Sequence, residues 1–198
     1  LVKLYFMIGL PTETDEDIRG IDQMIQKVSR IGREMRGKNI INVTISPFSP
    51  KAHTPFQWDQ QPSPDEIRQK SDFIRRQAHS STVNIKLRDP QLSFLEGIFG
   101  RGGRELADVV EAAFRSGARF DGWGETFDIS LWMKAFETNN INPLDYLKER
   151  PFSEVLPWSH IELEISAEHL MKERNRTSTM LASPIKKPEI ITAVASDE

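Results

Sequence analysis

The stretch Leu4-Tyr-Phe-Met-Ile-Gly-Leu-Pro-Thr-Glu-Thr-Asp-Glu-Asp-Ile18 decides how this chain folds. Its first five residues are all apolar, which is typical of a parallel strand that is covered on both faces. Gly9 and Pro11 then end the strand. Thr12 or Thr14 can cap a helix, and the acidic residues around them favour a helix amino terminus because they meet the positive end of the helix dipole. The stretch therefore predicts a strand, a sharp turn and a helix.

The predicted helix has one buried face, because apolar residues recur three or four positions apart. They are Ile18, Ile21, Met24, Ile25, Val28 and Ile31. A strand that leads into such a helix indicates an α/β fold, in which ligands lie at the carboxyl ends of the strands. Residues 8–14 are therefore the first place to look for a site, unless Gly9 and Pro11 serve only to shape the turn. Phosphate is the less favoured ligand, because the acidic first turn repels an anion.

The composition is that of a globular protein, with 38% hydrophobic and 28% charged residues. The net charge of -3 gives no indication of a polyanionic partner. No apolar run approaches the roughly 20 residues of a membrane-spanning helix, and no export leader is recognisable, so we expect a cytoplasmic protein. The absence of cysteine excludes disulfides, thiolate zinc sites and cysteine-bound iron–sulfur clusters within these residues.

The sequence begins with Leu1, and a strand of the buried type follows almost at once. Such a strand needs neighbours on both sides. We therefore expect the chain to be the later part of a longer protein.

A second strand is predicted by the β-branched residues of Ile40–Ser46. A strand, a helix and another strand imply a right-handed crossover, so both strands should run parallel and end at the same edge. The segment Pro47–Pro62 then carries four prolines and has no regular period. Long loops of this kind are often functional. Lys51, His53 and Trp58 could face a ligand there; alternatively, Trp58 anchors the loop and His53 is hydrogen-bonded within it.

The remaining sequence predicts one more strand and a series of helices. A helix from Ser63 to about His79 precedes the alternating strand Val83–Arg88, which has one wet face and belongs near the sheet edge. Helices are then expected near Leu92, Leu106, Asp128 and Asn142, and from Ser166 to about Arg174. We expect residues 1–88 to form the sheet, residues 89–175 a helical extension and residues 176–198 a polar tail.

The segment Gly100–Arg104 contains two arginines and backbone amides at a helix start. Such an arrangement could hold a phosphate or the carboxylate of a cofactor. The alternative is a short linker whose arginines form salt bridges, and both interpretations stay open at this stage.

Four segments, taken together, closely resemble the later half of a radical S-adenosylmethionine (radical SAM) family. They are Phe6-Met-Ile-Gly-Leu-Pro-Thr-Glu-Thr14, Ser46-Pro-Phe-Ser-Pro-Lys-Ala-His-Thr-Pro-Phe-Gln-Trp58, Phe99-Gly-Arg-Gly-Gly-Arg-Glu-Leu106 and Phe120-Asp-Gly-Trp-Gly-Glu-Thr-Phe-Asp128. The chain is most similar to the B12-binding-domain-containing subfamily of unknown function, whose members are often called Fe–S oxidoreductases. The resemblance covers residues 1 to about 170.

This resemblance implies a partial (β/α)6 barrel of the TIM-like kind, with the first two strands of this chain as its fifth and sixth strands. In the family a Cys-x3-Cys-x2-Cys loop holds a 4Fe–4S cluster, to which S-adenosylmethionine binds. Reductive cleavage of S-adenosylmethionine gives a 5′-deoxyadenosyl radical, which abstracts hydrogen from the substrate. The implied cofactors are therefore S-adenosylmethionine and the cluster, and cobalamin in an upstream domain is a further alternative.

The resemblance assigns cofactor contacts to six residues at the ends of these two strands. They are Met7, Gly9, Pro11, Ser46, Pro47 and Phe48. At the first strand, the absence of a side chain on Gly9 would let the flat adenine approach the backbone. The residues after the second strand would flank the adenosyl group or the substrate, and the following loop would help to exclude water. Glu13 stands one position later than the acid of the broader family pattern, and helix capping is enough to explain it.

The cysteine loop of the family is absent from this sequence, so these residues supply neither a metal ligand nor a catalytic residue. We therefore expect the carboxyl-terminal fragment of a radical SAM enzyme, inert by itself, whose substrate is unknown. Two alternatives stay open. The helical extension could be an RNA- or ribosome-binding module that uses Arg101, Arg104 and the basic face of the helix at residues 64–79, or the chain could be a structural domain without a ligand.

Overall fold

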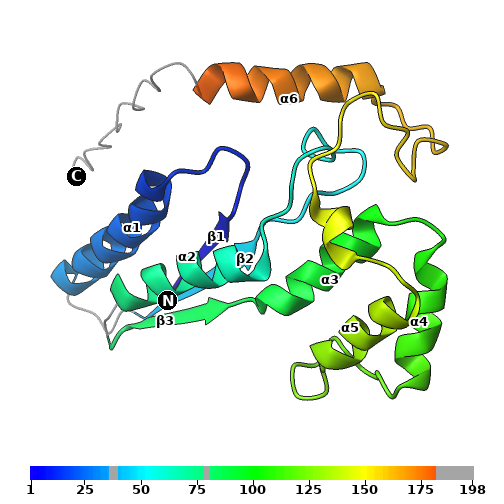
Figure 1. Cartoon of the computed structure of the whole chain (residues 1–198). Helices are drawn as coiled ribbons and strands as arrows, with labels where there is room; N and C mark the ends of the chain where they lie inside the picture. Colours follow the sequence, from blue (N-terminus) through cyan, green and yellow to red (C-terminus); the bar gives the residue numbers. More distant parts are fainter. Residues whose placement is uncertain (36–39, 78–80, 182–198) are drawn as a thin grey trace.

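The computed structural model describes residues 1–35, 40–77 and 81–181 (Figure 1). An α/β part comes first, with β1 (Val2–Ile8), α1 (Asp15–Glu34), β2 (Ile41–Pro47), α2 (Pro64–Gln77) and β3 (Val83–Leu87). A helical part follows, with α3 (Pro90–Arg101), α4 (Leu106–Arg115), α5 (Ile129–Thr138), the 3-10 helix η1 (Pro143–Leu147) and α6 (Ala167–Leu181). The α/β class predicted from the sequence is confirmed.

The three strands form one parallel sheet in the order β1-β2-β3. The register places Ile8 of β1 opposite Pro47 of β2, so these two strands end at the same edge, as predicted. β3 pairs only with β2 and lies at the edge of the sheet, also as predicted. Within the described residues the sheet is open, and its completion into a barrel stays a proposal.

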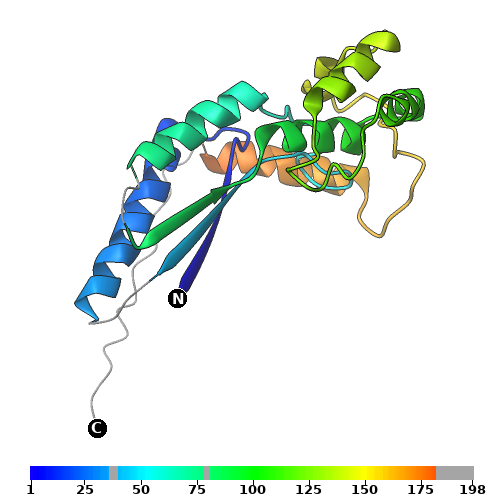
Figure 2. The same cartoon turned by 90° about the horizontal axis from the view of Figure 1, so that it is seen from below.

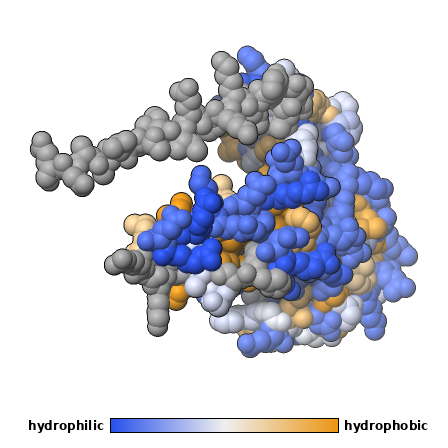
Figure 3. Space-filling model, turned by 90° about the vertical axis from the view of Figure 1, so that its left-hand side faces the viewer, coloured by the Kyte–Doolittle hydropathy of each residue, from blue (hydrophilic) through white to orange (hydrophobic). Residues whose placement is uncertain are grey.

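Helices α1 and α2 lie on the same side of the sheet (Figure 2). Between helices and strands is an aliphatic core, in which each buried side chain contributes about 1.5–3 kcal/mol relative to exposure. Its buried members are Ile8, Ile18, Ile21, Ile25, Ile41, Val43, Ile45, Ile67 and Ile74. Met24 and Ile31, which the helical period also assigned to the buried face of α1, remain 50% and 43% exposed. On the side of the molecule seen in Figure 3, apolar patches lie between hydrophilic residues at the surface.

The opposite face of the sheet is exposed in the described structure. Successive side chains of a strand point to opposite faces, so Leu4, Phe6 and Ile8 pack on the core while Tyr5 and Met7 point away from it. Tyr5 is 71% exposed and Met7 is 48% exposed. The expectation that β1 is covered on both faces is therefore wrong for the residues described.

The amino terminus of α1 is capped by Thr14, one of the two candidates. The Thr14 Oγ1 accepts a hydrogen bond from the Asp17 backbone N–H at 3.3 Å, and the Asp17 carboxylate accepts one from the Thr14 N–H at 2.8 Å. This reciprocal capping box lowers the pKa of Asp17, mainly through the hydrogen bond from the Thr14 backbone. Ser63 and Glu66 form the same pattern before α2.

The helical part has its own core, formed by α3, α4, α5 and η1. Asp128 and Asn142 cap α5 and η1 through their side chains. The last helix, α6, continues to Leu181 instead of ending near Arg174, so residues 176–181 do not belong to the tail that the sequence predicted. Residues 182–198 of that tail, and residues 78–80 after α2, lie outside the described residues.

Candidate functional site

The carboxyl ends of β1 and β2 bring the predicted site residues side by side. Met7 lies opposite Ser46 in the register, and the Phe48 backbone N–H donates a hydrogen bond to the Ile8 carbonyl at 2.8 Å. Met7 is 48% exposed and Ser46 is half-buried, and both lie on the face away from α1 and α2. These two residues are therefore available to a ligand at this edge.

Gly9 has a left-handed backbone, with φ at +83°. A Cβ on Gly9 would lie 2.6 Å from the Pro62 Cγ and 2.8 Å from the Ile67 Cδ1. The glycine is thus required by the turn and by the packing of the chain on itself, which is not the reason that the resemblance gives. Since Pro62 and Ile67 fill the space beside its α-carbon, adenine could approach only from another side, and that contact stays a prediction.

Glu13 stabilises the Gly9 turn by a hydrogen bond to its backbone. Its side chain is only 5% exposed; its Oε2 accepts the Gly9 backbone N–H at 2.9 Å, and its Oε1 pairs with the Lys70 Nζ at 2.5 Å. Helix capping, the role expected for Glu13, belongs to Thr14. The sequence placed Lys70 only on the basic face of the helix at residues 64–79, because nothing local marks a partner 57 residues away.

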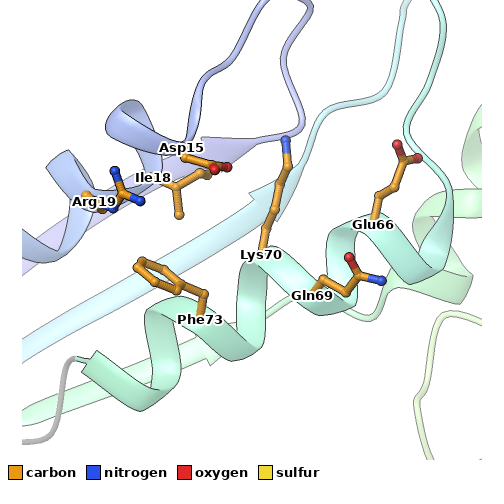
Figure 4. Close-up of a pocket in the computed structure, with 7 residues that line it drawn as sticks. All are labelled: Asp15, Ile18, Arg19, Glu66, Gln69, Lys70 and Phe73. Carbon is orange, nitrogen blue, oxygen red and sulfur yellow. The ribbon is translucent and has the colours of Figure 1, made fainter.

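A cavity of about 380 Å³ lies between α1 and α2 (Figure 4). Figure 4 shows Lys70 extending from α2 toward the turn after β1. The lining residues are Asp15, Ile18, Arg19, Glu66, Gln69, Lys70 and Phe73. Their charges are mixed, and the cavity lies on the helical side of the sheet, whereas Met7 and Ser46 lie on the other face. It is therefore separate from the strand-end site.

The remaining predicted contacts belong to the interior or to the turn. Pro47 is buried, and Phe48 is 5% exposed with its ring edge-on to Phe56 at 5.8 Å between centroids. Pro11 is half-buried in the turn. Pro47 and Phe48 can support the carboxyl ends of the strands from the interior, but their burial leaves little side-chain surface for a ligand.

The β2–α2 loop, residues 48–63, is mostly fixed by internal contacts. Trp58 is 4% exposed and packs edge-on against Phe152, so the anchor interpretation is confirmed for it. Lys51 is exposed and pairs with Glu96. His53 has a left-handed backbone, with φ at +56°, and its N–H donates to Gln57. Its Nε2 is buried without a hydrogen-bond partner among the described residues.

The segment Gly100–Arg104 is structural. Arg101 is fully buried, and its guanidinium donates hydrogen bonds to the carbonyls of Asp59 at 2.9 Å and Lys148 at 2.9 Å. Burial, and then the nearby charge of Arg150, lower the pKa of Arg101 to about 10, so it stays charged at neutral pH. The Gly103 N–H donates to the Glu105 carboxylate. The anion-site interpretation is therefore wrong for Arg101.

No metal site is evident in the part of the chain that the structure describes. Within residues 1–35, 40–77 and 81–181, no three or more histidine, aspartate or glutamate side chains are grouped closely enough to bind an ion. In the same ranges, no helix is both long enough and apolar enough to cross a membrane.

Part of the chain is similar to the uncharacterized protein MJ0966 of Methanocaldococcus jannaschii. The two sequences are 27% identical over 110 residues, which cover 56% of this chain and 23% of the relative. The match thus spans less than a quarter of that protein. No family model and no solved structure matches the chain.

Replacing Gly9 with alanine should lower the free energy of unfolding by roughly 2–4 kcal/mol, because φ is positive and the new Cβ overlaps Pro62 and Ile67. Urea denaturation followed by circular dichroism measures this loss. Gly117→Ala has a positive φ of +106° but open space, and Gly20→Ala has open space within α1. We expect the first control to lose about 1–2 kcal/mol and the second to lose nothing. A Gly9→Ala loss no larger than that of Gly117→Ala would contradict the packing argument.

Replacing Arg101 with methionine should lower the free energy of unfolding by roughly 3 kcal/mol or more, because buried carbonyl groups lose their donors at about 1–3 kcal/mol each. The matched control is Arg104→Met, which changes an exposed arginine of the same segment and should stay within about 0.5 kcal/mol of the parent. Both values come from denaturant titration. Equal losses in the two variants would show that the buried guanidinium is not the source of the stability.

Proposed function

We propose that this chain is the carboxyl-terminal part of a radical SAM enzyme that acts in the cytoplasm. Residues 1–88 then form the last strand–helix units of a partial (β/α)6 barrel, and the helices from Pro90 onward form its extension. One observation carries the proposal: the parallel sheet has α1 and α2 on one face, and the exposed Tyr5 and Met7 on the other. In such barrels helices surround the strands, the other face of the strands points into the barrel, and ligands bind at the carboxyl ends of the strands.

The residues present fit only the adenosyl side of the cofactor site. Met7 and Ser46 are accessible side chains at neighbouring strand ends, where the adenosyl group of S-adenosylmethionine would be held. The sequence has no cysteine, so the 4Fe–4S cluster must be bound by residues outside this chain. When bound, the cluster would supply the electron for reductive cleavage of S-adenosylmethionine. This chain contributes binding surface and the exclusion of water.

The edge that would hold the adenosyl group is rigid. The Glu13–Lys70 pair ties the Gly9 turn to α2, and the Phe48 N–H joins the two strand ends. Rigid supporting contacts are what a binding site needs to hold a ligand in a fixed geometry. By contrast, the burial of Arg101 removes one of the arginines on which RNA or ribosome binding depended.

The full-length protein that contains this chain should cleave S-adenosylmethionine after anaerobic reconstitution with iron and sulfide and reduction with dithionite. The products, methionine and 5′-deoxyadenosine, are measured by chromatography. Residues 1–198 alone should form neither product, because they lack the cysteine ligands. The coding sequence ahead of Leu1 should encode Cys-x3-Cys-x2-Cys. A full-length protein with no cluster absorbance and no cleavage would reject the proposal.

Met7→Trp in the reconstituted full-length protein should reduce the rate of 5′-deoxyadenosine formation at least about tenfold, because misplacing a bound reactant by about 1 Å can cost a hundredfold. The matched control is Met24→Trp, since Met24 on α1 is 50% exposed and Met7 is 48% exposed. The control should keep the parent rate. If both variants cleave S-adenosylmethionine equally well, the exposed face of the sheet does not border the cofactor.

A further inference from the structure

The exposed sheet face, which we call the open face, is polar. Its residues alternate with the core residues along each strand and fall into rows across the sheet. One row is Lys3, Asn42 and Asn84, the next is Tyr5, Thr44 and Lys86, and the last is Met7 and Ser46. Neighbouring strands are about 4.8 Å apart, so the side chains of one row are neighbours.

The polar composition of the open face indicates whether another protein layer or a polar space lies against it. Parallel sheets that pack between two protein layers have apolar side chains on both faces. Here the covered face is aliphatic, whereas the open face carries amides, hydroxyls and ammonium groups. Burying these groups against an apolar layer would cost free energy for every unpaired donor or acceptor. The open face is therefore suited to a water-filled or ligand-filled space.

Both charged side chains on this face are lysines. A hollow of about 350 Å³ lies over it, and no carboxylate is among its lining residues. They are Lys3, Tyr5, Asn42, Val43, Thr44, Asn84, Ile85 and Lys86. Asn84 donates its amide to the Asn42 Oδ1 at 3.1 Å, which leaves the Asn42 amide nitrogen to donate elsewhere.

The two lysines give the open face its charge. Lys3 and Lys86 are both exposed, and neither forms an ion pair with any residue in the described ranges. They lie on opposite sides of β2 and in adjacent rows, so two strand spacings and a two-residue offset put their backbones about 12 Å apart. Two ammonium groups with amide and hydroxyl donors between them match a molecule that carries two anionic groups.

We propose that the open face binds a small organic or inorganic anion with at least two negative charges, held by Lys3 and Lys86 across the Asn42–Asn84 pair. This inference goes beyond the proposed function: Lys3, Asn42 and Asn84 are each the second residue of their strand, so the anion site lies away from the carboxyl ends at which Met7 and Ser46 lie. The shared chemistry is that of phosphate and carboxylate oxygens. Pyrophosphate and citrate serve as probes that distinguish these two sources.

Lysine reactivity in the full-length protein tests where the anion binds. The protein is labelled with trace acetic anhydride at constant ionic strength, with and without each probe, and each lysine is quantified by mass spectrometry. At a probe concentration ten times its Kd, the labelling of Lys3 and Lys86 should fall about tenfold, because the free fraction is 1/(1 + [L]/Kd). Lys27 on α1 and Lys51 in the β2–α2 loop should be labelled as before.

A matched set of variants tests which lysines bind the probe. Lys3→Met and Lys86→Met should each raise the Kd of the bound probe, measured by titration calorimetry, by roughly tenfold, the effect of losing one charged hydrogen bond. Lys27→Met, an exposed lysine on the helical side of the sheet, should leave the Kd unchanged. A preference for pyrophosphate or citrate identifies the anionic group.

Three results would overturn this inference. They are no binding of either probe, an unchanged Kd in a variant that combines Lys3→Met and Lys86→Met, and a failure of Lys3 and Lys86 to react even without a probe. The last result would mean that acidic side chains from elsewhere in the protein already occupy them. Cleavage of S-adenosylmethionine, measured on the same preparations, separates the two proposals: cleavage without anion binding defeats only this one, and anion binding without cleavage defeats only the radical SAM assignment.

Discussion

Arg101 is the last residue of α3, and its guanidinium contacts two loops. It donates hydrogen bonds to the carbonyls of Asp59, in the β2–α2 loop, and Lys148, after η1. A buried cation needs hydrogen-bond acceptors to offset its desolvation. Both terminal nitrogens of the guanidinium have acceptors, whereas its Nε has no partner among the described residues. Arg101 thus connects α3 to the β2–α2 loop and to the segment after η1. Burial lowers the pKa of Arg101 to about 10, because the loss of water disfavours the charged form.

The β2–α2 loop also has buried polar side chains that hydrogen-bond to other parts of the chain. Gln61 donates to the Ser93 carbonyl at 2.8 Å, and Gly97 on α3 leaves room for it, since a Cβ there would lie 1.8 Å from the Gln61 Oε1. Asp59 binds Arg174 of α6 through both carboxylate oxygens, and this bond raises the pKa of Arg174. A loop of this length needs such contacts, because it has no ladder of backbone hydrogen bonds to order it. The loop therefore joins the sheet, α3 and α6.

Local chemistry made much of this fold predictable. The Thr14 cap, the parallel strands and the edge position of β3 depend on residues close in sequence or on general rules of chain connection. The roles of Glu13 and Arg101 were not predictable, because their partners, Lys70 and Lys148, lie 57 and 47 residues away. The exposure of Tyr5 was not predicted for a related reason. An apolar strand indicates that both of its faces can be buried, but it does not show whether other described residues cover the face on which Tyr5 lies.

These contacts support the strand-end site from one side only. Behind the edge, Phe48 and Pro62 fill the interior, and the Glu13–Lys70 pair locks the Gly9 turn to α2. On the other side, Met7 and the donors of the open face have no such packing in the described structure. Because the backbones of the strands are already ordered, only the exposed side chains lose conformational entropy when a ligand binds. A sheet whose one face is packed against α1 and α2 and whose open face is polar can thus hold a polar ligand without rearrangement of its backbone.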